Sequence, residues 1–299
     1  MRIGITGGLG FIGSALGREA RQRGHEVVVY SRKPQPAPAW AVACRVMDPA
    51  GTPALDVSGL DGLVHLAGES VVGYWTEAKK KRIRESRVPV TRKVVQALRD
   101  APGGDRPGVL VCASGSGAYG DRGDEVLTET STPGDGFLAE VCRDWEAAAR
   151  EAESVEGTRV VLLRTGMVLG ENGGAWPLLK KIFKMRLGSR LGDGRQWAPW
   201  IHLEDEVGII LHALETPGLR GPFNLGSPNP VTNAEMTSII AATLKTTKFF
   251  PAPAFAMKLA LGEFGSVVLD SQRMLPKVAL ESGYIFKHPD LRGAVSSLA

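Results

Sequence analysis

Hydrophobic positions along this chain alternate between short apolar runs and longer stretches in which apolar residues recur at intervals of three and four. The short runs predict buried strands, and the longer stretches predict helices with one apolar face. Strands that alternate with helices in this way form a parallel sheet covered on both faces. The predicted strands are 3–5, 26–30, 44–47, 60–67, 109–113 and 159–163, and the predicted helices are 11–23, 76–99, 138–153 and one through Val207, Ile210, Leu211 and Leu214.

A further set of elements is predicted from about residue 249 to the end of the chain. Two prolines precede a stretch with helical spacing, and a later proline ends a second such stretch. We expect this extension to cover a substrate cleft. Its predicted elements are a helix through Phe255, Leu259 and Leu261, a helix at 267–275 that stops at Pro276, a short strand at 283–286 and a closing helix that begins near 289–291.

The first predicted strand runs directly into a glycine-rich segment, TGGLGFIG at 6–13. Gly7 permits a tight turn, Gly10 lets backbone N–H groups approach a pyrophosphate, and Gly13 lets the following helix pack on the sheet. The positive end of the helix dipole then faces the phosphates. Because the motif follows a strand and opens an amphipathic helix, it predicts a dinucleotide site and a doubly wound α/β fold of the Rossmann type.

The end of the second strand indicates which dinucleotide is bound. Chains that bind NAD usually carry Asp or Glu there, to hold the ribose 2′-hydroxyl. Here the strand ends in Ser31, Arg32 and Lys33, and no acid is present. A hydroxyl and two cations suit a 2′-phosphate, and the arginine fork can pair with it through two hydrogen bonds. We therefore expect NADP rather than NAD, with solvated loop cations as the alternative interpretation.

Composition and charge exclude several other classes of protein. The chain is 43% hydrophobic and 23% charged, as globular proteins are, and its net charge of +4 is too small and too dispersed to indicate a nucleic-acid partner. The densest basic run, 79–82, points in every direction on a helix, which is typical of a solvated surface. No stretch approaches the length of a membrane span. Three cysteines without metal-ligand spacing fit a reducing compartment, so we expect a cytoplasmic protein that binds no metal.

Several motifs occur in a fixed order, namely TGGLGFIG at 6–13, HLAG at 65–68, AYG at 118–120, RTGMVLG at 164–170, WIHLED at 200–205 and FNLG at 223–226. Together they resemble the short-chain dehydrogenase/reductase superfamily, in its extended epimerase/dehydratase branch. A second set resembles a narrower group, the predicted nucleoside-diphosphate-sugar epimerases with a C-terminal extension: LAGE at 66–69, Trp75, Ser86-Arg87, Trp145-Glu146 and QRMLPK at 272–277. The resemblance covers nearly the whole chain.

The resemblance implies a set of cofactor contacts at the carboxyl ends of the strands. The pyrophosphate, the 2′-phosphate, the adenine edge, the ribose and the nicotinamide each have matching positions, although the acid at the adenine edge is nearly as well explained as a turn residue before proline. Glu69 joins the set, with a pocket anion or a surface acid as its other interpretations. The implied contacts are Gly7, Gly10, Phe11, Ile12, Gly13, Ser31, Arg32, Lys33, Asp48, Leu66, Ala67, Gly68, Glu69, Thr165 and Gly166.

The chain departs from the superfamily at the catalytic positions. Members normally carry Tyr-x-x-x-Lys on the helix after the fifth strand, where the lysine and cofactor lower the tyrosine pKa so that the phenol can pass a proton. Here the matching segment places Phe137 and Val141 at those positions, and no Tyr-x-x-x-Lys occurs elsewhere in the sequence. Phenylalanine has no proton to give, and valine carries no charge. Any proton transfer therefore needs other groups.

The remaining catalytic candidates follow the fifth strand. Ser114 and Ser116 supply hydroxyls, with small residues that make room for the nicotinamide as the alternative, and Tyr119 supplies a phenol, with a packed turn residue as the alternative. Glu69 and His202 are further candidates, although His202 at the entry of an acidic first helical turn favours a structural role. The candidates for substrate binding are Arg190, Arg195, Gln196 and Trp200, near a predicted tight turn at 192–194, with Arg186 and Trp197 beside them.

Three functions agree with these residues. The first is an NADP-dependent epimerase or oxidoreductase that acts on a sugar nucleotide and lacks the usual Tyr and Lys. The second is a non-catalytic protein that responds to NADP(H) occupancy, and the third is an NADPH-dependent reductase of a small carbonyl compound. All three expect a small-molecule ligand and no nucleic acid or membrane, and all are compatible with a homo-oligomer. The expected domains are 1–170 for NADP, with 197–216 returning to it, and a smaller α/β substrate-binding lobe at 171–299.

Overall fold

The computed structural model describes residues 1–47, 55–247 and 250–299. Its centre is a seven-stranded sheet in the order β12-β7-β5-β4-β1-β2-β3, in which every neighbouring pair is parallel. The predicted doubly wound fold is therefore confirmed. The strands are β1 (Arg2–Thr6), β2 (Glu26–Ser31), β3 (Ala43–Val46), β4 (Gly62–His65), β5 (Val109–Gly115), β7 (Arg159–Thr165) and β12 (Gly221–Leu225).

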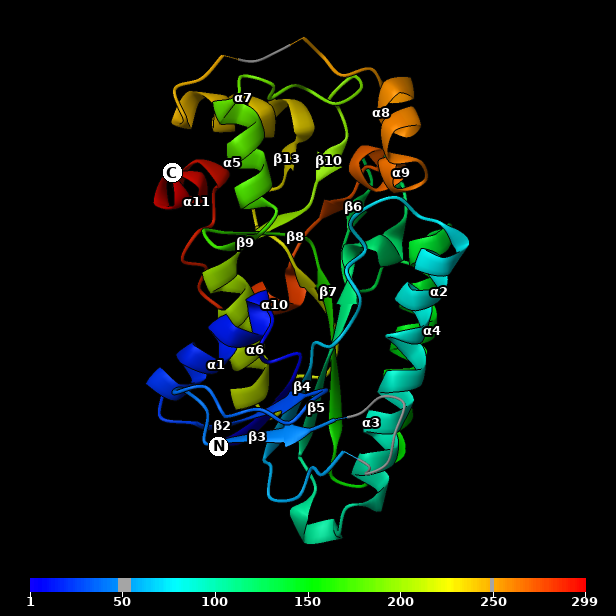
Figure 1. The fold of residues 1–299 in the computed structure, drawn as a ribbon, viewed down its shortest axis with the longest axis vertical. Coiled ribbons are helices and arrows are strands. Elements are labelled where there is room, and N and C mark those ends of the chain that lie inside the picture. Colours follow the sequence, from blue (N-terminus) through cyan, green and yellow to red (C-terminus); the bar gives the residue numbers. More distant parts are fainter. Residues whose placement is uncertain (48–54, 248–249) are drawn as a thin grey trace.

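Alternate side chains of each strand enter opposite cores, because successive residues of a strand point to opposite faces. Val27 and Val29 of β2 pack under α1 (Phe11–Gln22) and α6 (Leu203–Glu215). Val28 and Tyr30 pack on the other face, under α3 (Val88–Asp100) and α4 (Phe137–Arg150). Figure 1 shows the two helix pairs on opposite sides of the sheet.

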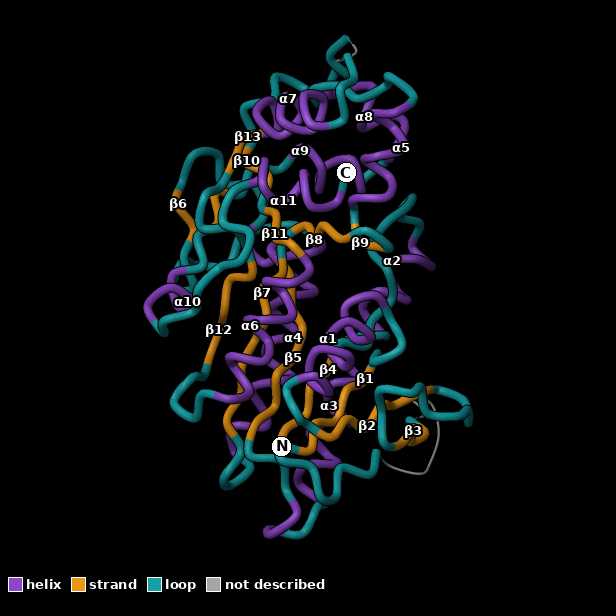
Figure 2. The backbone as a smooth tube through the Cα atoms, turned by 90° about the vertical axis from the view of Figure 1, so that its left-hand side faces the viewer, coloured by secondary structure: helices purple, strands orange, loops and turns teal. Residues whose placement is uncertain are grey.

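Smaller elements form a second region above the carboxyl edge of the sheet (Figure 2). It contains a three-stranded sheet and two two-stranded sheets, and its own core holds Trp176, Trp200 and Leu291. The strands are β6 (Val126–Leu127), β8 (Met167–Gly170), β9 (Gly173–Gly174), β10 (Trp197–Ala198), β11 (Trp200–His202), β13 (Val231–Thr232) and β14 (Arg273–Met274). The helices are α5 (Trp176–Lys184), α7 (Asn233–Thr243), α8 (Ala254–Leu261), α9 (Phe264–Leu269) and α11 (Leu291–Leu298). The short helix α10 (Lys277–Glu281) packs instead beside β12, with Ala279 in the core of the main sheet.

The structure corrects three predicted elements. The helix expected at 76–99 is two helices, α2 (Glu77–Glu85) and α3, because Pro89 in the first turn of α3 favours a new start there. The helix expected at 267–275 ends with α9, and the chain after it pairs as β14 with β6. The strand expected at 283–286 is absent, since Tyr284 there packs against Gly208 and donates to Asp205 instead of joining a sheet.

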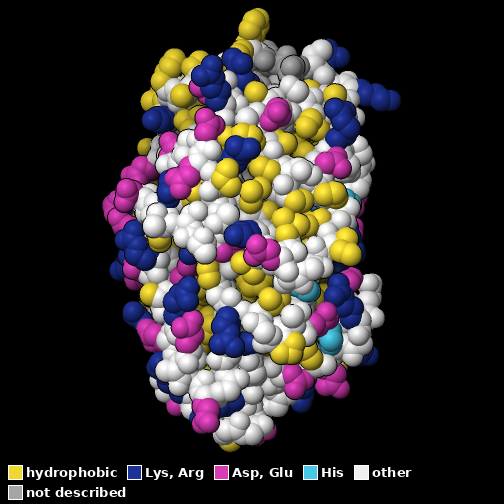
Figure 3. Space-filling model, turned by 180° about the vertical axis from the view of Figure 1, so that it is seen from behind, with side chains coloured by type: hydrophobic (Ala, Val, Ile, Leu, Met, Phe, Trp, Pro, Cys, Tyr) yellow, Lys and Arg dark blue, Asp and Glu magenta, His cyan; other side chains and the backbone are white. Residues whose placement is uncertain are grey.

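The surface is chemically mixed. On the face seen in Figure 3, acidic and basic side chains are interspersed, and apolar side chains gather over its upper half. Within the described ranges, no helix has the length and hydropathy needed to cross a bilayer.

Candidate functional site

The glycine turn after β1 has the backbone geometry that the predicted phosphate site requires. Gly7 has φ +69°, which favours glycine, and its carbonyl accepts a hydrogen bond of 2.9 Å from the N–H of Gly10. A Cβ at Gly13 would lie 2.3 Å from that same carbonyl oxygen, so only glycine allows α1 to start so close to the turn. The first turn of α1 has neither a side-chain cap nor an acidic residue. Its free N–H groups and positive dipole end therefore suit an anion.

The end of β2 offers cations beside this cradle. Arg32 and Lys33 are exposed, and neither forms an ion pair among the residues that the structure describes. The Ser31 hydroxyl donates to the carbonyl of Lys33 at 2.8 Å, which fixes a tight turn at the end of the strand. Strand β1 pairs with β2 as far as Thr6 and Tyr30, so this turn and the glycine turn leave the same edge of the sheet. Asp48 lies outside the described residues.

The loop after β4 completes the predicted cofactor edge. Leu66 donates from its backbone to Thr6 at 3.1 Å, which holds residues 66–68 against the glycine turn. Glu69 at the end of the loop forms an ion pair of 2.7 Å with Lys79. The hydrogen bond from Lys79 holds the pKa of the Glu69 carboxyl below its usual range. An ionised, partly exposed acid of this kind is a weak base, which favours its interpretation as a surface acid.

Two of the three catalytic candidates lie in a buried polar network. Ser114 donates to Glu146 at 2.8 Å, and the guanidinium of Arg164 donates to both oxygens of Glu146 at 2.8 and 2.9 Å. Arg164 also donates to the hydroxyl of Tyr119 at 3.0 Å, and that hydroxyl donates to Asn224 at 2.6 Å. All five side chains are less than a tenth exposed.

This burial changes the roles that the sequence favoured for these residues. Tyr119 is fully buried, and burial raises its pKa, so it holds its proton inside the core. The network leaves Ser114 with its hydroxyl directed to Glu146 rather than to a cleft. Ser116 is different, because it is half-buried at the start of a 3₁₀ turn directly after β5. Of the three hydroxyls, that of Ser116 has the most access to a ligand.

The four predicted substrate residues are not brought to one surface. Arg190 and Arg195 are exposed on either side of the turn at 192–194, where Gly192 and Gly194 have positive φ. Gln196 is buried and donates to the carbonyl of Leu191 at 3.1 Å. Trp200 is 1% exposed and packs in the core of the second region, which argues against it as a substrate contact.

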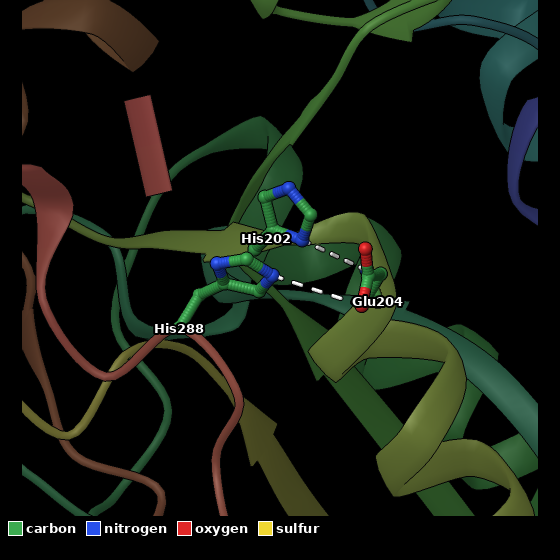
Figure 4. A group of neighbouring side chains, drawn as sticks. All are labelled: His202, Glu204 and His288. Carbon is green, nitrogen blue, oxygen red and sulfur yellow. Dashed lines mark hydrogen bonds and ion pairs between the residues drawn. The ribbon is translucent and has the colours of Figure 1, made fainter. Parts of the chain in front are cut away.

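His202 caps α6, as its position at the helix entry predicts. Its Nδ1 accepts the backbone N–H of Glu204 at 3.1 Å, and its ring stacks on that of His288 with 3.7 Å between centroids (Figure 4). Glu204 lies 3.7 Å from Nε2 of His288, so the three side chains are close enough to hold a metal ion. The two rings are tilted by 35° to each other, and the Glu204 N–H already occupies Nδ1 of His202, whereas Nε2 of His202 is buried without a hydrogen-bond partner among the described residues. The hydrogen bond at Nδ1 is that of a helix cap.

Comparison with known proteins decides the family. The sequence pattern of the NAD dependent epimerase/dehydratase family matches residues 3–226, which include the whole main sheet. The chain belongs to the NAD-dependent epimerase/dehydratase family. A second pattern, described as a domain of unknown function (DUF1731), matches residues 252–298. The family and the C-terminal extension that the motifs predicted are both confirmed.

The relatives of this epimerase/dehydratase family member span nearly its full length. It is 38% identical over 302 residues to "Epimerase family protein SDR39U1 homolog, chloroplastic" of Arabidopsis thaliana, covering 100% of this chain and 86% of that protein. It is 35% identical to "Epimerase family protein YfhF" of Bacillus subtilis (strain 168), covering 100% and 98%. The crystal structure of human epimerase family protein SDR39U1 (isoform 2) with NADPH is 34% identical, with a TM-score of 0.90 over 100% of this chain and 99% of that chain.

In this member of the epimerase/dehydratase family, the positions matched to Tyr and Lys are filled by apolar packing. The Phe137 ring meets Trp75 edge-on at 5.1 Å between centroids, and Val141 is 1% exposed. Both belong to a cluster that also contains Phe264 from the C-terminal extension. The extension thus packs where a proton-transfer pair is absent.

The structure also reveals an acid that the sequence analysis missed. Glu206 is 1% exposed on α6, and one carboxyl oxygen accepts a hydrogen bond of 2.9 Å from Thr165 at the end of β7. The other oxygen is buried without a hydrogen-bond partner among the described residues. Burial raises the pKa of Glu206 to about 8. The signal was present in the sequence, because Glu206 stands three, four and seven residues before Ile209, Ile210 and Ala213, on the buried face of the helix.

Proposed function

We propose that this protein binds NADP(H) at the carboxyl edge of its main sheet. The observation that carries the proposal is the junction of an uncapped α1 with a β2 end that offers Arg32 and Lys33 and no acid. The free N–H groups at the start of α1 suit the pyrophosphate, and the two cations after β2 suit the ribose 2′-phosphate. The human relative crystallised with NADPH supports the same choice of nucleotide.

We further propose that the protein is an oxidoreductase or epimerase for a small molecule. Bound NADP(H) would supply or accept a hydride. The loop at 66–68, together with Thr165 and Gly166, would hold the ribose and nicotinamide, and the half-buried hydroxyl of Ser116 would orient a substrate oxygen. The exposed Arg190 and Arg195 suit the diphosphate of a sugar nucleotide.

Replacing Arg32 with Asp is expected to shift nucleotide preference from NADPH toward NADH. The change removes a charge-assisted pair with the 2′-phosphate and adds a repelling carboxylate, so we expect the ratio of the two dissociation constants to change by about tenfold to hundredfold. Titration of nicotinamide fluorescence with both nucleotides measures this ratio.

Arg292→Asp provides the control, because Arg292 is an exposed arginine on α11, away from the glycine turn. It should leave the ratio unchanged. An unchanged ratio in Arg32→Asp as well would remove Arg32 from the site and with it the main reason to favour NADP.

A second function is supported by the apolar packing of Phe137 and Val141, namely NADP(H) binding without turnover. The two functions differ in whether a substrate is converted. A reductase oxidises NADPH, whereas an epimerase returns the hydride to its substrate and leaves the cofactor unchanged. Incubation of the protein and NADP(H) with sugar nucleotides and with simple aldehydes and ketones distinguishes the functions when both nicotinamide absorbance and the sugar products are followed. Loss of absorbance or appearance of an epimerised sugar, abolished in Ser116→Ala, supports the enzyme. Tight NADPH binding with neither change in any mixture supports the binding protein.

A further inference from the structure

An arginine outside the predicted site lies against the loop after β4. Arg87 occupies the N-cap position of α3, and its guanidinium packs over the ring of Trp145 at 5.0 Å from the ring centroid. A Cβ built on Gly68 would lie 3.4 Å from the guanidinium carbon. Gly68 itself is exposed. The Arg87 guanidinium therefore lies beside the loop at 66–68, which the proposed function assigns to the ribose.

The guanidinium of Arg87 uses only one of its three nitrogen atoms as a hydrogen-bond donor among the described residues. Its Nη1 donates to the carbonyl of Ile83 at 3.1 Å and to the hydroxyl of Ser86 at 3.2 Å. Within the described ranges, Nε and Nη2 make no hydrogen bond, and no carboxylate lies within ion-pair distance. Burial lowers the pKa of Arg87, because water is partly withdrawn from the cation and the negative charge of Glu69 offsets this only in part.

Arg164 is a buried arginine whose charge is neutralised by a carboxylate, and it provides a comparison for Arg87. There, both oxygens of Glu146 accept hydrogen bonds from the guanidinium. Withdrawing a charge from water without such a partner is costly. Arg87 is half-buried and has no carboxylate within ion-pair distance among the described residues, which is also true of Arg159 and Arg273. Arg87 differs from these two in lying against the exposed Gly68.

The position of Arg87 also compensates for a missing charge. Its neighbours Cys142 and Trp145 lie on α4, on the same helix as Val141 and within one turn of it. Val141 is the position at which the resemblance to the superfamily expects a lysine, and it is apolar here. Arg87 brings a cation beside this part of α4 from a different helix.

We infer that Arg87 donates hydrogen bonds to the hydroxyls of the nicotinamide ribose of NADP(H) and thereby positions that half of the cofactor. This inference rests on the proposed function, because it needs NADP(H) in the site. Gly68 leaves the approach open, and the stacking on Trp145 holds the guanidinium plane in place. Arg87 is a positioning residue, and hydride transfer remains with the cofactor.

Two ligands of the unmodified full chain test this inference. NADPH carries the nicotinamide ribose, whereas adenosine 2′,5′-bisphosphate carries only the adenosine half with its 2′-phosphate. Arg87→Met should weaken NADPH about tenfold and leave the bisphosphate unchanged, since loss of a hydrogen bond to a charged group has about that effect. Arg87→Lys, which keeps the charge and the stem but loses the fork, should fall between wild type and Arg87→Met.

Lys81→Met is the matched control, because Lys81 is a 73% exposed cation on the neighbouring helix α2. It should change neither affinity. Equal weakening of both ligands in Arg87→Met, or no change in either, would overturn the inference, and Arg87→Lys decides the matter if the methionine variant does not fold. If the wild type binds neither NADPH nor the bisphosphate, the proposed function is rejected instead.

Discussion

Replacing Glu146 with Gln is expected to lower the free energy of unfolding by about 3–5 kcal/mol, which is the usual cost of removing one partner from a buried ion pair. Glutamine keeps the shape but has no charge, and its amide would direct N–H groups at a guanidinium that has only donors. Arg164 would then be a buried cation at 5% exposure without its carboxylate. The destabilisation should extend beyond the ion pair, since Ser114 bonds to Glu146 and Tyr119 bonds to Arg164.

Urea unfolding near neutral pH measures this cost, and α4 offers a matched control. Glu140→Gln changes a 56% exposed acid on the same helix whose ion pair with Arg84 is 3.4 Å long, and it should cost about 0–1 kcal/mol. If the two variants were equally stable, Glu146 would not be the counter-ion on which the buried arginine depends. The network also joins Asn224 to the carbonyl of Leu275, so cooperative unfolding of sheet and extension should be lost together with the pair.

The parts of the molecule that the sequence predicted are those decided by local chemistry. The glycine turn needs Gly7 at positive φ, which favours glycine, and Gly13 beneath a carbonyl oxygen, where a Cβ would not fit. The strands β1, β2 and β5 are buried on both faces, so they read as continuous apolar runs. In these segments the residues alone determine the structure.

The parts that the sequence did not predict are decided by distant partners. Tyr119 looked like a loop phenol, but its hydroxyl bonds to Asn224, more than a hundred residues away, and this partner holds it in the core. The chain after Leu269 has helical spacing, yet pairing with β6 and the bonds of Ser271 to Asp121 and Gly123 make it extended. Ser86-Arg87 is among the motifs of the resemblance, but nothing in the sequence assigned Arg87 a role until the fold placed it beside Gly68.

The contribution of Glu206 to the stability of this protein should fall as pH rises through the neutral range. Burial raises the pKa of its carboxyl from the ordinary value of 4.5 to about 8 in the folded chain. Folding therefore favours the protonated acid. Its contribution is fully present below the pKa of the unfolded chain and is lost as pH rises through the folded value. Between about pH 5 and about pH 8 this group should remove about 3 kcal/mol of stability.

Glu206→Gln removes the ionisation but keeps an oxygen that can accept the hydrogen bond from Thr165. Relative to wild type, the variant should gain about 3 kcal/mol between about pH 5 and about pH 8. Urea unfolding at closely spaced pH values measures both curves. Glu204→Gln is the control, because Glu204 is a 54% exposed acid two residues away in the first turn of the same helix, and it should follow the wild-type curve. Parallel curves for wild type and Glu206→Gln would show that the carboxyl at the end of β7 is already ionised in the folded protein, in which case it cannot hold a proton beside the proposed nicotinamide site.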